Sequence, residues 1–513
     1  MKIKRIAIVG AGTAGWLAAN HLGHELRADP EVQITVIESA EIPTIGVGEG
    51  TVPYIMKGLE RFGISEAELL LQCDCTFKQG IKFVNWLDET KHGHNNYYYH
   101  PFDSPYPGGF DISPYWLTQQ HKIPFDDIGI QARIAELGLA PKQRSSGEYQ
   151  GALSYAYHFN ALKFAALLAN NAKQRFRVQH QVATVVGAHT DENGLISALI
   201  TEDGDRLEFD FYIDCSGFSS ILIDKTLKVP FISKAAELLT DRAMVQQVPV
   251  TADQALTPYT TATAHKAGWI WDIPLTNRRG TGFVYSSQHM SDEEARLLFA
   301  EYLGMDATNF APRQIPMQVG YREQFWAGNC VALGLAQGFV EPLEATSILV
   351  TDFSAELLAR HFPRYQQDIA VCQPYVNQVL RYVWDGVVDF IKLHYFLSDR
   401  QDSAFWSDNR DENKLSAQLK NRLAMFKLRP PQQNDFFSRF DLFNEKNFLY
   451  VLYGMKFQTQ LPLLTDYEKK RSQDILQSNQ KVVASAAKEL MPHRDWLEGL
   501  KRAAEQAALT PQQ

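Results

Sequence analysis

The chain has 513 residues, more than one domain usually contains, so we expect two or more packed modules. Its 45% hydrophobic and 21% charged residues are typical of an ordinary globular protein. The formal net charge of −9 and the lack of a dense Lys/Arg block exclude a general nucleic-acid binder, and no apolar run is long enough to cross a bilayer. The sequence therefore predicts a soluble protein with no nucleic-acid or membrane partner.

Cysteines and histidines give no support to a disulfide framework or a metal site. The five cysteines are an odd number, and only Cys73 and Cys75 are close together in the chain. His92, His94 and His100 have no carboxylate or cysteine at a spacing that would complete a metal site. We therefore expect reduced thiols, a cytoplasmic location and no bound metal.

The chain opens with a strand, a glycine-rich turn, a helix and a second strand. Residues 5–9 form a short apolar run, typical of a strand that is buried on both faces. The turn at 10–15 follows, then helical spacing over 16–27 and a strand over 33–37 that ends on Glu38. This order predicts the first unit of a dinucleotide-binding fold.

The turn itself has the spacing Gly10-x-Gly12-x-x-Gly15, with Thr13 and Ala14 before the third glycine. The first glycine permits the tight turn, the second admits a pyrophosphate, and the third lets the helix pack on the strand. The N-terminus of the helix offers N–H groups to the phosphates, and Glu38 is placed to accept hydrogen bonds from a ribose. The alternative is a chance glycine-rich turn, and the motif alone does not distinguish FAD from NAD.

The rest of the chain divides into a mixed region and a helical region. Strands are predicted over 181–186 and 195–200, on either side of a turn at 191–194, and over 209–213. From residue 352 onwards the apolar spacing is helical, as in 352–361 and 375–396, and the tail after Ala503 is expected to fray. We predict an α/β body over residues 1–351, with substrate-side segments inserted at about 77–150, and a mainly helical substrate-side module over 352–513.

Five segments in order resemble motifs of the flavin-dependent tryptophan halogenases. They are the turn Gly10 to Trp16, the segment Ile42 to Pro53, the pair Phe77-Lys78 with Ile81 to Trp86, the WxWxIP signature from Trp269 to Pro274, and the segment Phe339 to Ser347 with its FxEPLE pattern. The resemblance implies a Rossmann-type FAD-binding body like that of single-component flavin monooxygenases, joined to a largely helical C-terminal module.

The resemblance also implies the cofactor and its source of electrons. FAD would lie against the glycine-rich turn and Glu38, with further contacts from Glu49, Val182, Leu335 and Ile348. Because no second GxGxxG is present to hold a nicotinamide nucleotide, the FAD would arrive already reduced from a separate NAD(P)H-flavin reductase. Chloride or bromide would be the co-substrate, and a homodimer is left open.

Catalytic roles follow from the same resemblance. Hypohalous acid would travel through a tunnel to Lys78, which holds it by a hydrogen bond or as a haloamine. Glu344 would face the substrate, stabilise the cationic ring intermediate and accept its proton. Trp269 and Trp271 would wall off the flavin. Without the motifs, Lys78 and Lys82 are a solvated pair one helical turn apart, Glu344 is a surface or capping carboxylate, and the two tryptophans are one face of a strand.

Two departures from the family pattern concern the halide and the substrate. Thr346 and Ser347 stand at the halide-binding step, where Ser347 replaces a glycine that tolerates a positive φ. His100, Phe102 and Phe443 keep stacking faces for a flat aromatic substrate. The positions that hold the charges of free tryptophan in the family correspond here to Pro431, Gln432 and Ser438, with Glu445 or Asp441 as substitutes if the alignment is shifted. We therefore expect an indole-like substrate without the amino-acid charges.

Three functions remain open on the sequence. The first is a two-component halogenase that acts on an indole-like or other electron-rich aromatic. The second is a flavin-dependent monooxygenase that hydroxylates its aromatic substrate, against which Lys78 and the WxWxIP signature argue. The third is a non-catalytic flavoprotein, which only the Ser347 departure and the missing substrate clamp favour.

Overall fold

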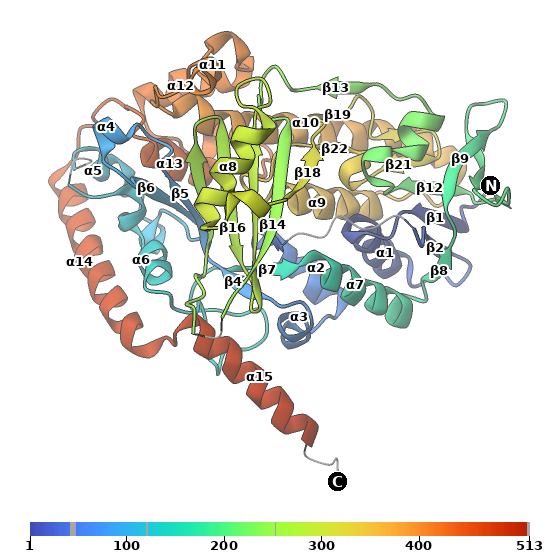
Figure 1. Cartoon of the computed structure of the whole chain (residues 1–513), viewed down its shortest axis with the longest axis horizontal. Coiled ribbons are helices and arrows are strands. Elements are labelled where there is room, and N and C mark those ends of the chain that lie inside the picture. The colour runs from blue at the N-terminus through green and yellow to red at the C-terminus, as the bar shows by residue number, and fades with distance from the viewer. Residues whose placement is uncertain (42–47, 120–121, 252, 510–513) are drawn as a thin grey trace.

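A six-stranded sheet at one end of the molecule holds the predicted nucleotide-binding unit (Figure 1). The computed structural model describes residues 1–41, 48–119, 122–251 and 253–509. The strand order is β20 (Trp326–Ala327), β21 (Cys330–Ala332), β12 (Phe211–Asp214), β1 (Arg5–Val9), β2 (Gln33–Glu38) and β8 (Gln179–Val182). All neighbours are parallel except β20 and β21. Strand β1 is central and buried from Ile6 to Val9, as its uninterrupted apolar run predicts.

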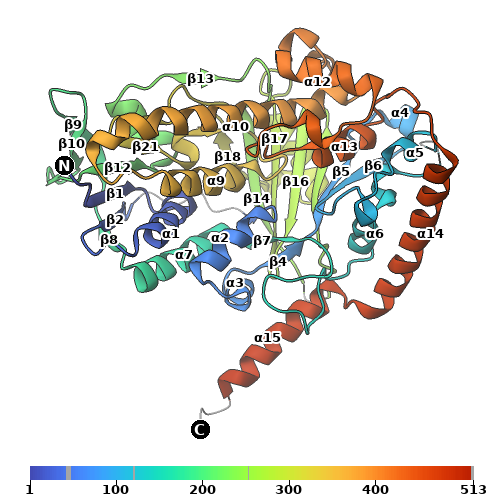
Figure 2. The ribbon, with the colours of Figure 1, turned by 180° about the vertical axis from the view of Figure 1, so that it is seen from behind.

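Helix α1 (Thr13–Leu26) packs against this sheet between α7 (Ala161–Phe176) and α9 (Thr346–Arg360) (Figure 2). It is buried on nearly every side, with Trp16, Leu17, Ala18 and Ala19 all inaccessible, because helices cover it as well as the sheet. The first helix of the nucleotide unit is therefore bound directly to α9, which follows the FxEPLE segment.

A seven-stranded sheet forms the middle of the molecule (Figure 1). Its order is β18 (Arg313–Pro316), β14 (Arg242–Pro249), β17 (Arg278–Tyr285), β16 (Gly268–Pro274), β15 (Thr260–His265), β5 (Gly80–Val84) and β6 (Tyr97–Pro101). The pair β15–β5 is parallel, with Thr260 beside Ile81, and the other pairs are antiparallel. A small sheet of β3 (Gly48–Gly50), β7 (Ala156–Asn160) and β4 (Thr76–Lys78) contacts it through β3.

The remaining described strands form two further three-stranded sheets, and additional helices connect the larger elements. The strands are β9 (Val185–Thr190), β10 (Ile196–Thr201), β11 (Arg206–Leu207), β13 (Phe231–Ser233), β19 (Gly320–Arg322) and β22 (Gly338–Phe339). The helices are α2 (Tyr54–Phe62), α3 (Glu66–Gln72), α4 (Glu89–His92), α5 (Ser113–Leu117), α6 (Gln131–Glu136), α8 (Asp292–Leu303) and α11 (Ala404–Asn409).

The C-terminal third is helical, as predicted. After β22, the described elements are helices, chiefly α9, α10 (Ile369–Leu397), α12 (Ala417–Leu428), α13 (Glu445–Gly454), α14 (Asp466–Glu489) and α15 (His493–Leu509). The predicted α/β class with a helical C-terminal region is confirmed. The division into modules at residue 351 stays a prediction, because α9 crosses that residue and one continuous hydrophobic core contains residues from both sides.

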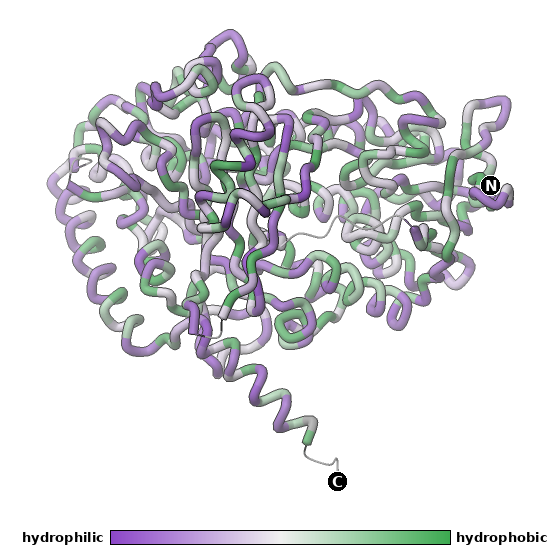
Figure 3. Tube along the Cα trace, in the orientation of Figure 1, coloured by the Kyte–Doolittle hydropathy of each residue, from purple (hydrophilic) through white to green (hydrophobic). Residues whose placement is uncertain are grey.

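Two local predictions were wrong. The strand predicted over 181–186 is interrupted, because β8 ends at Val182 in the parallel sheet and β9 starts at Val185 to pair with β10. The tail after Ala503 does not fray at that point, because α15 continues to Leu509. Helix α15 points away from the body, and hydrophilic residues make up much of α14 (Figure 3).

No helix in the described part of the chain is both long and apolar enough to cross a membrane. The five cysteines are all unpaired thiols, and Cys73, Cys75 and Cys330 are buried.

Candidate active site

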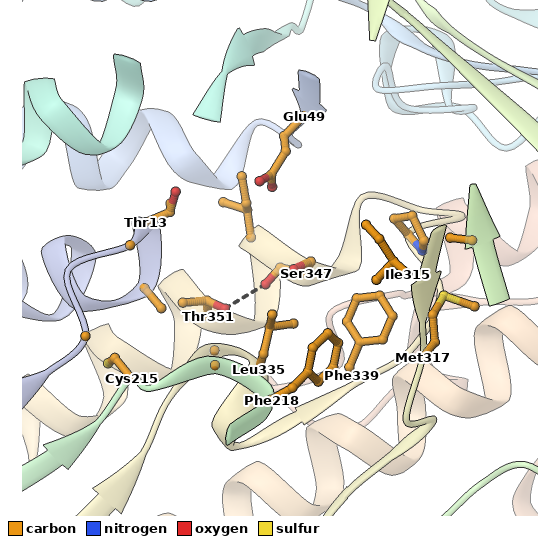
Figure 4. Close-up of a pocket in the computed structure, with 18 of the residues that line it drawn as sticks. Thr13, Glu49, Cys215, Phe218, Ile315, Met317, Leu335, Phe339, Ser347 and Thr351 are labelled. Carbon is orange, nitrogen blue, oxygen red and sulfur yellow. Dashed lines mark hydrogen bonds between the residues drawn. The ribbon is translucent and has the colours of Figure 1, made fainter. Parts of the chain in front are cut away.

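A cavity of about 500 Å³ runs from the glycine-rich turn to Lys78, between the parallel sheet and the central sheet. Figure 4 shows part of its lining. This volume is in the usual range of ligand sites, about 300–1,000 Å³. Its lining includes twelve of the predicted site residues: Gly10, Gly12, Thr13, Ala14, Glu38, Glu49, Lys78, Trp269, Trp271, Leu335, Ser347 and Ile348. In Figure 4, Thr13, Leu335 and Ser347 lie around one space although they come from α1, a short 3₁₀ helix (Gly334–Ala336) and α9. The structure therefore brings most of the predicted cofactor residues together.

The glycine-rich turn fits a dinucleotide for the expected steric reasons. Gly10 has φ +108°, and a Cβ on it would lie 2.2 Å from the carbonyl oxygen of Cys215. A Cβ on Gly15 would lie 1.9 Å from the carbonyl oxygen of Gly10, so this glycine packs α1 on the turn and does not line the cavity. Helix α1 begins without a side-chain cap, which leaves its first N–H groups free for phosphates.

Three further residues were predicted to contact the cofactor: Glu38, Glu49 and Val182. Glu38 ends β2 and has one oxygen 2.8 Å from His180 Nε2, so its other oxygen is free to accept a ribose hydroxyl. Burial raises the pKa of Glu49 to about 7. Val182 is 64% exposed and outside the cavity lining, where its neighbour Ala183 contributes instead. Residues 42–47 of the second motif lie outside the described residues.

Lys78 ends the short strand β4 and is buried, with 1% of its surface exposed. The alternative of a solvated helical pair is wrong, since Lys82 lies on β5 and is paired with Glu136. Within the described parts of the chain no acceptor forms a hydrogen bond with the Lys78 ammonium, which lies 5.5 Å from the centre of the Phe102 ring. Burial lowers the pKa of Lys78 to about 8, against the opposing charge of Glu344.

The strand that carries Lys78 is fixed from the far end of the chain. The backbone N–H of Phe77 donates to His493 Nε2 at 2.9 Å, and His493 Nδ1 lies 3.1 Å from the carbonyl oxygen of Leu256, to which it donates. The Phe77 ring also packs edge-on against Trp496, 4.9 Å away between ring centres. The start of α15 thus supports β4, a contact that the sequence did not suggest.

Glu344 is a buried carboxylate held by two histidines. His100 Nδ1 lies 2.9 and 3.0 Å from its two oxygens, and His394 Nε2 lies 2.9 Å from one of them. Burial alone would raise the pKa of Glu344, but its electrostatic interactions and hydrogen bonds with His100 and His394 lower it to about 2. Glu344 is therefore an anion, neither the surface carboxylate nor the helix cap of the alternative interpretation.

The neighbours of the two histidines fix where their protons lie. Asn447 Oδ1 accepts the Asn444 N–H, so its amide nitrogen donates to His100 Nε2 at 3.1 Å, and His100 keeps its proton on Nδ1 for Glu344. His394 Nδ1 donates to the Phe390 carbonyl oxygen, which can only accept, and His394 Nε2 lies 2.9 Å from Glu344. His394 is thus the second histidine partner of Glu344, and no pattern in the sequence pointed to it.

Trp269 and Trp271 project from the same face of β16, with ring centres 6.2 Å apart, and both line the cavity. Trp269 is oriented by Glu341, whose Oε1 accepts its indole N–H at 3.2 Å and the Tyr395 hydroxyl at 2.5 Å. The Thr240 hydroxyl donates to the other oxygen. Burial raises the pKa of Glu341 to about 7. Glu341 is the first glutamate of FxEPLE, so that motif was the available signal for it.

The positive φ expected at Ser347 falls instead on Ala345, with φ +55°. Ser347 is the second residue of α9, where its helical conformation needs no glycine, so the concern that the serine strains this step was misplaced. Helix α9 begins without a side-chain cap, which leaves N–H groups free at Thr346 and Ser347. These two residues also line a second cavity of about 10 Å³, enough for roughly one water-sized particle.

The predicted substrate residues are only partly assembled. His100 is turned to Glu344, and Phe102 faces Lys78. Phe443 is buried and stacks on Phe390, with ring centres 4.1 Å apart. The other two histidines of the 92–100 segment lie outside this group: His92 forms a hydrogen bond with Asp399, and His94 forms one with Glu89.

The residues considered for holding the charges of an amino-acid substrate differ in the contacts that they already make. Asp441 accepts the Tyr382 hydroxyl at 2.7 Å and lies 3.5 Å from Arg422, so its charge is already compensated. The Ser438 N–H donates to Asp441, and the Ser438 hydroxyl oxygen accepts the Phe440 N–H. Glu445 is buried at the start of α13, where none of the described side chains donates to its carboxylate. Of the two substitutes considered from the sequence, Glu445 is the one still free to hold a cation.

Together the parallel sheet, the glycine-rich turn and the cavity define a protein with a Rossmann-type dinucleotide-binding fold. The family profile for tryptophan halogenase matches residues 5–467. Tryptophan 6-halogenase ThaL of Streptomyces albogriseolus is 35% identical over 443 residues, 83% of this chain and 82% of that protein. Tryptophan 7-halogenase RebH of Lentzea aerocolonigenes is 33% identical over 483 residues, 88% of this chain and 90% of its own length.

A solved structure gives the same result. The crystal structure of tryptophan halogenase from Shewanella frigidimarina superposes with a TM-score of 0.93 at 36% identity, covering 98% of both chains. The chain belongs to the tryptophan halogenase family. It is a flavin-dependent halogenase, and the alternatives of a monooxygenase and a non-catalytic flavoprotein are not favoured.

Proposed function

We propose that this halogenase uses reduced FAD, dioxygen and chloride or bromide to halogenate an electron-rich aromatic ring such as an indole. The observation that supports this best is the continuity of the cavity, whose lining runs from the glycine-rich turn to a buried lysine within electrostatic reach of the anion Glu344. In its reduced form the bound FAD supplies, with dioxygen and halide, the chemistry that yields hypohalous acid and water. The residues of the chain bind the cofactor and the halide and transfer protons during halogenation.

The protein first has to hold the cofactor and the halide. The turn residues Gly10 and Gly12 and the open N-terminus of α1 bind the pyrophosphate, and Glu38 binds the ribose. Free N–H groups at Thr346 and Ser347 bind the halide, since the start of a helix favours an anion. Trp269 and Trp271 separate the flavin from the aromatic substrate, so that the substrate is halogenated and not oxygenated.

Lys78 and Glu344 then act on opposite ends of the transfer. The Lys78 ammonium donates a hydrogen bond to the oxygen of hypohalous acid and gives that oxygen a proton as the oxygen–halogen bond breaks. Glu344 stabilises the cationic ring and takes the ring proton, so that the products are the halogenated ring and water. His100 and His394 keep Glu344 ionised and in place.

The direct test is product mass. Incubating the protein with reduced FAD, bromide and a panel of aromatics should give products with the bromine isotope pattern. A product heavier by one oxygen atom, with no halogenated species, would identify a monooxygenase instead.

We further propose that electrons come from a separate flavin reductase. The described cavity contacts account for one dinucleotide, and the sequence has one GxGxxG. The purified chain alone should therefore oxidise NADH and NADPH no faster than free FAD does, and an unrelated flavin reductase should restore halogenation. Absorbance at 340 nm checks this; rapid oxidation of NADPH by the chain alone would contradict it. A homodimer and a cytoplasmic location also remain predictions.

The substrate is proposed to be an indole without amino-acid charges. Ser438 cannot pair with an ammonium as a carboxylate would, and an unpaired charge taken from water is destabilised by several kcal/mol. We expect kcat/KM for indole to exceed that for free tryptophan by tenfold or more, measured at one rate of flavin supply. Glu445→Gln is the variant that tests the alternative clamp, because Glu445 is the buried carboxylate that could replace Ser438 as the partner of an ammonium group. A preference for tryptophan that disappears in Glu445→Gln would show that Glu445 is an ammonium clamp.

A further inference from the structure

A buried chain of hydroxyl and imidazole groups ends beside Lys78 and has no role in the steps above. His158 Nδ1 lies 2.9 Å from Thr76 Oγ1, and His158 Nε2 lies 2.9 Å from Thr260 Oγ1. Thr76 and His158 are fully buried, whereas Thr260 lines the cavity. The three residues come from β4, β7 and β15, which meet at the point where the small sheet contacts the central sheet.

The direction of these hydrogen bonds is fixed by a carbonyl group. Thr76 Oγ1 lies 2.6 Å from the carbonyl oxygen of Pro274, which can only accept, so the Thr76 proton goes there. His158 Nδ1 must then donate to Thr76. Burial and the charge of Lys78 hold the pKa of His158 well below its usual range, so its ring is neutral and Nε2 is an acceptor. Thr260 therefore donates to His158 and keeps its oxygen lone pairs for the cavity.

Those lone pairs face the same small space as the Lys78 ammonium. A Cβ added to Gly50 would lie 3.2 Å from Lys78 Nζ and 3.4 Å from both Thr260 Oγ1 and His158 Cδ2. Over the described residues, no donor reaches Thr260 Oγ1 and no acceptor reaches Lys78 Nζ. An unused acceptor and an unused donor thus lie on one wall of the cavity. A ligand that completes both must accept one hydrogen bond and donate another.

We propose that Thr260 is a further catalytic residue, which accepts the O–H of hypohalous acid while Lys78 donates to the same oxygen. The inference rests on the proposed function, because that reaction supplies the acid. The O–H group is held at the wall and the halogen is directed away from it. As the ring carbon bonds to the halogen, the oxygen–halogen electron pair goes to oxygen, which takes a proton from Lys78 and leaves as water. Glu344 takes the ring proton, which returns to Lys78 through solvent.

This arrangement selects the neutral acid over the hypohalite anion. The anion has no proton to donate, so it would place its oxygen against the Thr260 lone pairs without a hydrogen bond. Hypohalous acid is also the form whose oxygen–halogen bond is easier to break, since protonated oxygen is the better leaving group. The His158 chain therefore sets which form of the oxidant Lys78 meets.

The test compares Thr260→Val, which removes the hydroxyl at nearly constant volume, with Thr260→Ser, which restores it. Thr261→Val is the matched control, because the neighbouring side chain on β15 points to the opposite face. Thr260→Val should lower kcat by about tenfold, the effect of one lost hydrogen bond of roughly 1.4 kcal/mol, with unchanged KM for the aromatic. More hypohalous acid should escape to a soluble scavenger. Thr260→Ser and Thr261→Val should behave like the parent.

A second measurement needs no turnover. Methanol is a stable analogue of hypohalous acid, with a methyl group in place of the halogen. Crystals of the FAD-free parent soaked in methanol should place its oxygen within hydrogen-bond distance of both Lys78 Nζ and Thr260 Oγ1, and those of Thr260→Val should lose this molecule.

The two measurements separate the two hypotheses. A parent that binds methanol at this wall but halogenates no aromatic would contradict the proposed function and leave the binding site in place. Two outcomes would overturn the role of Thr260 alone. One is a Thr260→Val variant with the kcat of the parent, and the other is a parent crystal in which the bound methanol forms no hydrogen bond with Thr260.

Discussion

Replacing Lys78 by methionine should lower the rate of halogenation by about 10³-fold or more, while FAD binding and peroxide release continue. Among the described residues that line the cavity, Lys78 is placed to give the departing oxygen a proton, and donors of this kind contribute about 10²–10⁴-fold. Methionine keeps the volume of the side chain, so the effect is one of charge and not of packing. Single-turnover assays that measure halogenated product and peroxide from the same sample would check this. Halogenation at the parental rate would disprove the role of Lys78.

The same variant should be more stable than the parent, which separates loss of chemistry from loss of fold. The pKa of Lys78 falls from 10.5 to about 8, so at pH 7 the buried ammonium destabilises the fold by about 3 kcal/mol relative to an uncharged side chain. The unfolded chain keeps its proton up to pH 10.5, whereas the native protein loses it near pH 8. The gain from methionine should therefore be largest below pH 8 and shrink between pH 8 and 10.5, as thermal denaturation would measure.

Replacing Glu344 by glutamine should lower kcat about 10²–10⁴-fold, the range typical of a lost general base. Glutamine has the same shape but can neither take the ring proton nor stabilise the cationic ring with a negative charge. The KM for the aromatic should change little, because the carboxylate acts on the reacting ring and not on binding. Stopped assays of product against aromatic concentration would give both constants.

The pH profile provides an independent check on Glu344. Because its pKa is lowered to about 2, the carboxylate stays ionised throughout the working range, so kcat should show no acid limb from this group above about pH 4. An acid limb between pH 4 and 6 that disappears in Glu344→Gln would contradict the two-histidine clamp.

The identity of the main site residues could be predicted from the sequence, but their surroundings could not. Lys78 and Glu344 were found because each lies in a distinctive motif. The partners of Glu344, by contrast, are 244 and 50 residues away in the chain, at His100 and His394, and only His100 lies in a segment with an assigned role. Proton positions on His158 and His394 follow from neighbouring carbonyl groups, which no sequence pattern reveals.

The local errors have physical causes as well. A three-residue strand such as β4 is too short for a period of two to be recognised, so Lys78 and Lys82 appeared to be one helical turn apart. The positive φ after the FxEPLE glutamate was assigned to Ser347 because a glycine marks that position in relatives, although the turn actually bends at Ala345. Both cases depend on backbone geometry that several residue types can adopt.

The hydrogen bond from Phe77 to His493 joins residues 416 positions apart and affects the order in which the enzyme becomes competent during synthesis. A ribosome that adds about 5–20 residues per second needs roughly 20–80 s to travel from one partner to the other. Until then, the nascent strand that carries Lys78 has one N–H without its acceptor and lacks the cover of Trp496. A chain released before residue 493 would hold a nucleotide-binding unit with an incomplete lysine site, so the lysine site is complete only after residue 493 has been synthesised.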